Sequence, residues 1–373
     1  LGFSTRKKEK IFHVKPPSWR PDISGEADLV EEIVRVNSLT KLKGIPLSRK
    51  NLGVGAPILT DKQKRIFTIR RKIASEGMNE CITYSFIDSR SAEMFKNSVE
   101  LIPLSNPISS EMSYMRSSLL PGLCFAAKRN QARSLNNLKL FEVGDSFVGS
   151  EPGQQSVHAS GLMTGYFAQK NAFEKQRVVD VFDCKSVVSE SLKEIGVYHE
   201  NLLLKSDNAP QYFHPGRSGS FSQGPKNKLA FFGELHPEVV NFYGLKGPVM
   251  GFEIFIENIP FPNSKKLTRK PVINSEFQSV ERDFAFVVDN SCPVEAIKKA
   301  ILKVEKTFLA EVLVFDIFEG PKAELQLGHN KKSVAFAVKL QPLESTFTIE
   351  DIEKISQEII SSVKNAVGAT LRA

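Results

Sequence analysis

Four acidic residues near the start of the chain stand close enough in sequence to share one cation. Asp28, Glu31 and Glu32 fall at positions i, i+3 and i+4 of a segment with helical periodicity, and Asp22 lies on the loop before it. Carboxylates crowded on one helical face repel one another unless a positive charge lies among them. A hard, oxygen-seeking ion such as Mg²⁺ suits that position. The alternative is that acids in a first helical turn favour the positive end of the helix macrodipole, and the spacing leaves both interpretations open.

An extended loop and an amphipathic helix must position these acids. Three prolines keep residues 15–22 extended, because each proline disfavours helical backbone in the residue before it. Ser24 is expected to cap the helix that follows. The apolar residues expected on the buried side of this helix are Leu29, Val30, Ile33 and Val36. The strand-like segment 10–14 has no earlier element to pair with, and the chain opens on Leu1, so the sequence is expected to be a fragment.

Composition excludes several classes of protein. With 373 residues, 41% hydrophobic and 25% charged, the chain is expected to form two or three ordinary globular domains. No apolar run approaches the roughly 18 residues that cross a membrane, and no signal peptide opens the chain. The four cysteines form no C-x-x-C pair, which argues against a disulfide framework or a zinc ribbon and favours a cytoplasmic location. The net charge of +8 suits a polyanionic partner such as RNA.

A strand, a helix and a strand are predicted over residues 106–148. Ser118 and Pro121 mark the start of a helix, and Leu120, Leu123 and Ala127 recur at helical spacing. From 138 to 148 the period falls to two, with Leu138 and Leu140 on one face. On the other face we expect Phe141, Val143 and Phe147. This pattern predicts a strand of a large antiparallel sheet.

Further elements are expected around that sheet. Residues 60–76 and 180–195 read as helices with apolar residues at helical intervals. The segment 81–88 alternates, and we expect Ile82, Tyr84 and Phe86 on its buried face. Residues 44–57 and 260–275 read as linkers.

The strings MRSSLLPGL, LFEVGDSF, FHPGRSG and GELHPEVV resemble the β subunit of bacterial phenylalanyl-tRNA synthetase, over nearly the whole chain. The string SWRPDI followed by DLVEE resembles the segment in which Asp22, Asp28, Glu31 and Glu32 would bind Mg²⁺ at the junction with the α subunit. The resemblance implies an α₂β₂ heterotetramer that joins phenylalanine to tRNA(Phe), with ATP bound mainly by the α subunit. It also implies that the absent amino-terminal part contains an oligonucleotide-binding barrel and an editing module.

The last hundred residues follow a β-α-β-β-α-β order, which is the ferredoxin-like plan. The string VERDFAFVVD resembles the anticodon-arm-binding domain of the same synthetase subunit. Residues 271–373 carry 12 Lys and Arg against 15 Asp and Glu, so RNA binding there needs a local basic patch. The candidates for that patch are Arg282, Lys298, Lys299, Lys303, Lys331 and Lys332. Lysines on an exposed helix are more often simply solvated.

We predict an α+β fold in three parts. Residues 1–46 are expected to be part of a small α/β, metal-binding domain that contacts the α subunit, and residues 47–262 a class II synthetase-like antiparallel sheet with flanking helices. Residues 276–373 are expected to form the ferredoxin-like domain. The middle domain is predicted to be a catalytically inactive copy, because class II adenylation needs arginines on the developing phosphate charge. By analogy with catalytic relatives one should follow Phe147, where Val148 stands, and another should follow the strand GFEIF, where none does.

Two competing functions remain. The chain is interpreted as a noncatalytic part of a ligase complex, or as a free-standing RNA-binding or structural protein built from the same folds. A large exposed apolar patch near the acidic helix and along the central sheet favours the ligase complex, and a wholly polar surface favours the free-standing protein. His214 and His236 have neither metal-binding spacing nor flanking cysteines and are not expected to be catalytic.

Overall fold

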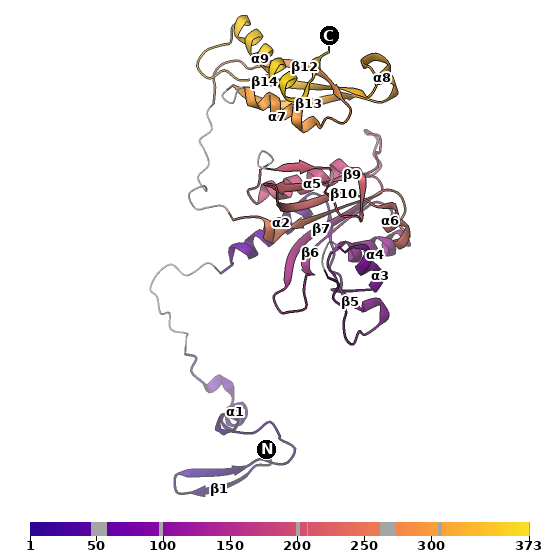
Figure 1. Ribbon diagram of the computed structural model, residues 1–373. Coiled ribbons are helices and arrows are strands. Elements are labelled where there is room, and N and C mark those ends of the chain that lie inside the picture. The colour runs from indigo at the N-terminus through magenta and orange to yellow at the C-terminus, as the bar shows by residue number, and fades with distance from the viewer. Residues whose placement is uncertain are drawn as a thin grey trace. The chain divides into compact units, whose positions relative to one another are not determined.

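The structure is a computed structural model that describes residues 1–45, 58–96, 100–198, 202–206, 208–261, 274–304 and 308–372. The chain divides into two compact units, Leu1–Phe261 and Pro262–Ala373 (Figure 1). Most of the expected linkers, 46–57 and 262–273, lies outside the described residues. Among the helices that are described, none combines the length and apolar character that crossing a membrane requires.

The amino-terminal segment, residues 1–45, is a hairpin followed by a helix. Strand β1 (Ser4–Lys8) pairs antiparallel with β2 (Ile11–Lys15), and α1 (Glu26–Asn37) and a 3₁₀ turn (Leu39–Lys41) follow. The expectation that the strand near residue 10 lacks an earlier partner was therefore wrong. The partner is β1, a strand of polar and charged residues that carries no apolar signal, and Glu9 takes φ of 56° in the tight turn between the two strands.

The burial expected for α1 was also wrong. Val30, Ile33 and Val36 are 58%, 66% and 65% exposed, whereas Glu32 is only 7% exposed. An amphipathic pattern shows which face of a helix prefers burial, but burial also requires an element that covers the face. In residues 1–45 the loop carrying Arg20 covers the Glu32 side instead.

A seven-stranded sheet forms the centre of residues 58–261. Its strand order is β3-β6-β7-β11-β10-β9-β8, and all neighbours are antiparallel except β3 and β6. The strands are β3 (Asn79–Glu80), β6 (Leu138–Phe147), β7 (Gln155–Thr164), β8 (Leu203–Lys205), β9 (Phe213–Gln223), β10 (Asn227–Leu235) and β11 (Val249–Phe255). The predicted large antiparallel sheet is thus confirmed, with one short parallel strand at its edge.

Helices cover both faces of this sheet (Figure 1). Helices α2 (Asp61–Ser75) and α5 (Val181–Glu194) pack on the face that includes Phe141 and Val143. Helices α4 (Leu120–Gln131) and α6 (Pro237–Tyr243) pack on the face that includes Leu138 and Leu140. The predicted two-sided character of β6 is therefore confirmed for these four residues. Ser118 caps less directly than expected, because its Oγ accepts from Leu120 N while Leu119 is the capping residue.

The segment 81–88 has the opposite orientation from the prediction. Ile82 and Tyr84 are 94% and 73% exposed, and only Phe86–Ile87 (β4) is extended, pairing with β5 (Tyr114–Met115). Thr83 points inward instead, because its hydroxyl donates to the buried carboxylate of Glu142. A buried charge that needs a donor decides the direction here over two apolar side chains. The short elements α3 (Ser89–Met94), the 3₁₀ turns Ser110–Met112 and Ile256–Asn258 complete this unit.

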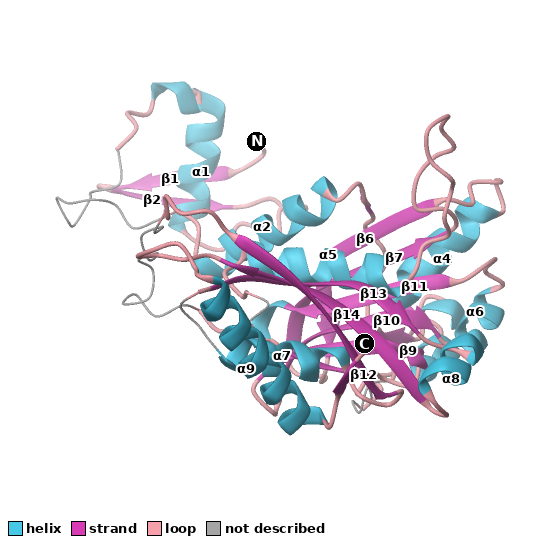
Figure 2. Ribbon diagram, turned by 90° about the horizontal axis from the view of Figure 1, so that it is seen from above, coloured by secondary structure: helices cyan, strands magenta, loops and turns pink. Residues whose placement is uncertain are grey.

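The carboxyl-terminal unit contains a four-stranded sheet of order β13-β14-β12-β15. Its elements are β12 (Val280–Asp289), α7 (Val294–Val304), β13 (Leu309–Phe318), α8 (Pro321–Leu327), β14 (Lys331–Leu340), α9 (Ile349–Val367) and β15 (Thr370–Leu371). Figure 2 shows its long strands β12, β13 and β14 and its helices α7 and α9. Helices α7 and α9 share one core with Phe284, Phe286 and Phe336 of the sheet. The expected β-α-β-β-α-β order is confirmed, and the short helix α8 between β13 and β14 is an addition that the sequence pattern did not predict.

Candidate functional site

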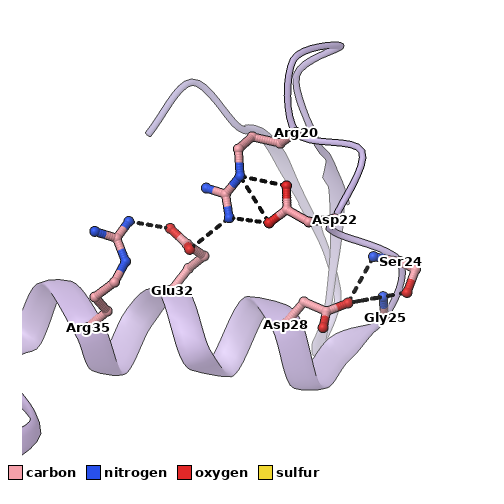
Figure 3. A network of polar contacts seen from close by, with 7 residues as sticks. All are labelled: Arg20, Asp22, Ser24, Gly25, Asp28, Glu32 and Arg35. Atoms are coloured by element: carbon pink, nitrogen blue, oxygen red, sulfur yellow. Dashed lines mark hydrogen bonds and ion pairs between the residues drawn. The ribbon is translucent and has the colours of Figure 1, made fainter. Parts of the chain in front are cut away.

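The predicted acidic site is a network of carboxylates and arginines (Figure 3). Arg20 donates from Nε to Asp22 Oδ1 at 2.9 Å and from Nη2 to Asp22 Oδ2 at 2.6 Å. The same Nη2 donates to Glu32 Oε1 at 2.8 Å, and Arg35 Nη2 donates to Glu32 Oε2 at 2.7 Å. The guanidinium of Arg20 therefore lies between two of the four predicted metal ligands. These arginines hold the pKa of Glu32 at about 2 and lower that of Asp22.

Asp28 serves a different purpose at the start of α1. Its Oδ2 accepts from the backbone N–H groups of Ser24 and Gly25, each at 2.8 Å. These two hydrogen bonds lower the pKa of Asp28, and they satisfy backbone donors that precede the helix. Figure 3 shows Asp28 turned toward this cap, apart from the Arg20 pair. Glu31, which is exposed, has no hydrogen bond or ion pair with another described residue.

The four predicted ligands have the chemistry that Mg²⁺ prefers, but the structure does not arrange them around one ion. Four carboxylates are the ligands that a hard cation prefers. Within the described parts of the chain, however, no three Asp, Glu, His or Cys residues come together in a way that could hold a metal ion. Both oxygens of Asp22 and of Glu32 already accept from arginine. As arranged, the residues therefore do not fit a Mg²⁺ ion held by all four acids.

The six basic residues predicted to bind RNA are spread over three elements of the carboxyl-terminal unit. Lys298, Lys299 and Lys303 lie on α7, Arg282 lies on β12, and Lys331 and Lys332 begin β14. Lys332 pairs with Val288 of β12, six residues beyond Arg282, which is roughly 20 Å along a strand. Lys299 is paired with Glu295 at 3.7 Å, and Lys332 donates to the carbonyl of Asn290. The strand register thus separates Arg282 from Lys331 and Lys332.

A buried ion pair between Arg116 and Glu142 lies beside the seven-stranded sheet of residues 58–261. Arg116, in the string MRSSLLPGL, donates from Nη1 to Glu142 Oε1 at 2.8 Å and to Thr83 Oγ1 at 2.9 Å. Its Nε donates to the carbonyl of Asp145 at 2.9 Å, and Thr83 Oγ1 donates to Glu142 Oε2 at 2.6 Å. Arg116 and Glu142 are each 4% exposed. Every charge in this network has partners, which is the condition under which a buried pair is tolerated.

Two glycines make room for the network. A Cβ at Gly144 would lie 2.9 Å from Arg116 Nη2, and one at Gly122 would collide with the hydroxyl of Thr83. The close approach of the Arg116 side chain therefore requires a glycine at position 144.

A pocket of about 220 Å³ lies where β6 and β11 end and β7 begins. Val148, the residue that stands where an adenylating arginine is expected, lines it. Its charged lining residues among those described are Glu253 and Glu257, so the pocket presents carboxylates where phosphate chemistry needs cations. His158 also lines it, and burial lowers the pKa of this imidazole to about 4.

The sequence reasoning missed Arg20, Arg35, His158 and Glu253. The pairing of Arg20 and Arg35 with the acids could have been predicted, because these arginines flank the four acids in sequence and opposite charges near each other tend to pair. Glu253 carried no such signal, because Ser118 and Tyr212, which donate to it, are 135 and 41 residues away, and His158 carried none because it shares the pocket with residues of β11. They could be found only once β7 and β11 were known to be neighbours in the sheet.

Comparison with family models assigns all three regions. The description "tRNA synthetase B5 domain" matches residues 1–38, and "Phenylalanyl tRNA synthetase beta chain CLM domain" matches residues 45–256. The description "Ferredoxin-fold anticodon binding domain" matches residues 275–372. The last match agrees with the strand order observed in the carboxyl-terminal unit.

Curated relatives agree with these models. The phenylalanine–tRNA ligase beta subunit of Cereibacter sphaeroides is 48% identical over 96% of this chain and 44% of the relative. That of Ruegeria pomeroyi is 44% identical over 100% of this chain and 45% of the relative. The chain thus spans slightly less than half the length of these relatives.

A solved pyrrolysyl-tRNA synthetase from Desulfitobacterium hafniense aligns over 52% of this chain and 66% of its own, with a TM-score of 0.40 and 12% identity, and we draw nothing from it. The family models and the relatives together establish membership. The chain belongs to the family of phenylalanyl-tRNA synthetase β chains.

Proposed function

We propose that this chain works as a noncatalytic part of phenylalanine–tRNA ligase, bracing the catalytic α subunit and holding tRNA(Phe) during ATP-dependent aminoacylation in the cytoplasm. The observation that carries the proposal is the exposed apolar side of α1, where Val30, Ile33 and Val36 lie beside the acid–arginine network. An exposed apolar face of this kind marks a surface for another protein. It favours a subunit of a complex over a free-standing RNA-binding protein. An α₂β₂ heterotetramer is the assembly we propose.

Three domains are proposed for these roles. Residues 1–46 would contact the α subunit, residues 47–262 would form a class II synthetase-like core without catalysis, and residues 276–373 would bind the anticodon arm. The absence of catalysis is supported by Val148 and by the two carboxylates that line the pocket beside it. Arg282, Lys298, Lys299, Lys303, Lys331 and Lys332 remain the candidate RNA contacts.

Co-expression with a phenylalanyl-tRNA synthetase α subunit tests the proposal. We expect the two chains to purify together, and the complex to bind a tRNA(Phe) transcript with an affinity that falls steeply as salt is raised. An Ile33→Asp variant should reduce the recovery of α, whereas the control Ile349→Asp, which alters a similarly exposed isoleucine of the other unit, should not. ATP–pyrophosphate exchange is expected only when α is present. Exchange by the isolated chain, or failure of α to co-purify, would contradict the proposal.

We propose that the assembled enzyme binds Mg²⁺ at Asp22, Asp28, Glu31 and Glu32. This requires a different arrangement from the one described above, in which arginines occupy the oxygens of Asp22 and Glu32. An ion held by all four acids requires Arg20 to leave Asp22 and Glu32, because these carboxylates have no free oxygen while it remains. ATP is proposed to be bound mainly by α.

Arg20→Gln is therefore expected to strengthen Mg²⁺ binding several-fold, the scale on which exposed charge pairs act. Mn²⁺ binding to the purified chain, followed by electron paramagnetic resonance and competed with Mg²⁺, measures this. Lys43→Gln, which removes an exposed positive charge of the same amino-terminal segment outside the network, is the control. Equal affinity in wild type and Arg20→Gln would show that Arg20 does not compete, and no binding in either would remove the four-acid site.

A further inference from the structure

Glu253 is a buried carboxylate that no positive side chain neutralises in the described parts of the chain. It is 2% exposed and lines the 220 Å³ pocket. Its Oε1 accepts from Ser118 Oγ at 2.6 Å and its Oε2 accepts from Tyr212 OH at 2.5 Å. The other carboxylate of the pocket differs, because Glu257 is paired with Lys62 at 2.5 Å.

The contrast with Arg116 and Glu142 shows what is missing. Glu142, a buried carboxylate on the same sheet as Glu253, has the guanidinium of Arg116 at 2.8 Å. An ionised carboxylate away from water is costly without such a partner. Burial accordingly raises the pKa of Glu253, although the two hydroxyl donors favour the charged form. The two partners of Glu253 are thus neutral hydroxyl groups, and a cation that enters the pocket would supply the missing opposite charge.

The remaining walls define the shape and character of that cation. Phe255 lines the pocket and meets the ring of His158 edge to face, with centroids 4.8 Å apart. His158 is neutral near pH 7, so it does not repel a positive group. Aromatic walls beside a carboxylate suit an ammonium group attached to a flat apolar body. The volume is below the roughly 300–1,000 Å³ of pockets for drug-sized ligands, which limits the ligand to a small molecule.

We propose that this pocket binds a small primary ammonium compound with an aromatic body, whose charged group pairs with Glu253 beside Tyr212 while its ring lies against Phe255. The binding is noncovalent, and no bond is made or broken. When Glu253 is neutral in the free protein, its proton passes to solvent as the ammonium group takes its place. This role goes beyond the proposed function, because it needs neither the exposed face of α1 nor the carboxyl-terminal unit, and it can be tested on the chain without the α subunit.

Benzylammonium and benzyl alcohol are the probes that test the proposal. They share size and ring, and differ in the charge of the group that would meet Glu253. Isothermal titration of the full 373-residue chain is expected to show saturable binding of benzylammonium at least about tenfold tighter than that of benzyl alcohol, which is the ratio supplied by a charged hydrogen bond. Equal affinity for the two probes, or no binding of either, would overturn the proposal.

Glu253→Gln locates the effect. The amide keeps the shape of the side chain and can still pair with Ser118 and Tyr212, but it carries no charge. We expect this variant to lose the preference for benzylammonium. Glu238→Gln, which removes an exposed charge from α6 outside this pocket, should keep it. A preference that survives in Glu253→Gln would place the ammonium elsewhere and overturn the assignment, and the comparison of the two probes on wild type decides the proposal if the variant does not fold.

Discussion

Replacing Arg116 by methionine is expected to lower the free energy of unfolding of residues 58–261, which contain the seven-stranded sheet, by about 3–5 kcal/mol. The loss arises from what remains, because Glu142, which is 4% exposed, would keep only the hydroxyl and the backbone N–H of Thr83 as donors and no positive charge. The carbonyl of Asp145 would lose its donor as well. Urea unfolding, monitored by hydrogen exchange of the amides in β6 and β7, measures this change. Tryptophan fluorescence is less suitable, because the single tryptophan, Trp19, lies in the amino-terminal segment.

A double change separates the cost of an unpaired charge from the cost of lost packing. Arg116→Met combined with Glu142→Leu removes both charges, and we expect it to recover much of the stability, since a buried pair replaced by apolar groups is often nearly neutral. Lys193→Met is the control for an exposed pair, because Lys193 and Glu190 are 57% and 41% exposed. Its expected effect is below about 1 kcal/mol. If Arg116→Met cost no more than this control, the buried pair would not be a stabilising element.

Elements with strong local periodicity could be predicted from sequence, and contacts between distant segments could not. Helix α9 ends at Gly368, and β6 places Leu140 and Phe141 on opposite faces, because helical and extended backbones fix these directions locally. The orientation of Ile82 depended on Glu142, a residue 60 positions away that draws Thr83 inward. No pattern within residues 81–88 contains that information.

The candidate site divides in the same way. Helical spacing placed Asp28 and Glu32 on α1, but the path of the loop before the helix decided which charges meet. Arg20 reaches Glu32 across twelve residues, and only the folded loop brings them together. The alternative to a metal ligand, an acid that favours the positive end of the helix macrodipole, agrees with the place of Asp28 in the first turn, but the sequence did not predict its hydrogen bonds to the backbone of Ser24 and Gly25.

Acid is expected to lower the free energy of unfolding of residues 58–261 through the protonation of His158. This imidazole is 7% exposed, Ser156 Oγ lies 2.8 Å from its Nε2, and burial lowers its pKa from 6.5 to about 4. The unfolded chain therefore takes up a proton below pH 6.5, whereas the folded chain does so only near pH 4. Because the unfolded state binds the extra proton in this window, stability falls as the pH falls from 6.5 to 4. The full loss is about 3 kcal/mol at 1.36 kcal/mol per pKa unit.

The difference between wild type and His158→Gln isolates this effect from the carboxylates that titrate in the same range. Glutamine removes the proton uptake, so the stability advantage of wild type over the variant should shrink as the pH falls from 7 to 4. Thr164→Val, a buried change on the same strand without an ionisable group, should differ from wild type by a constant amount at every pH. Urea unfolding at several pH values measures all three proteins. A constant difference between wild type and His158→Gln would mean that the folded protein accepts the proton as readily as the unfolded chain, and that the strand arrangement around β7 does not keep this imidazole neutral.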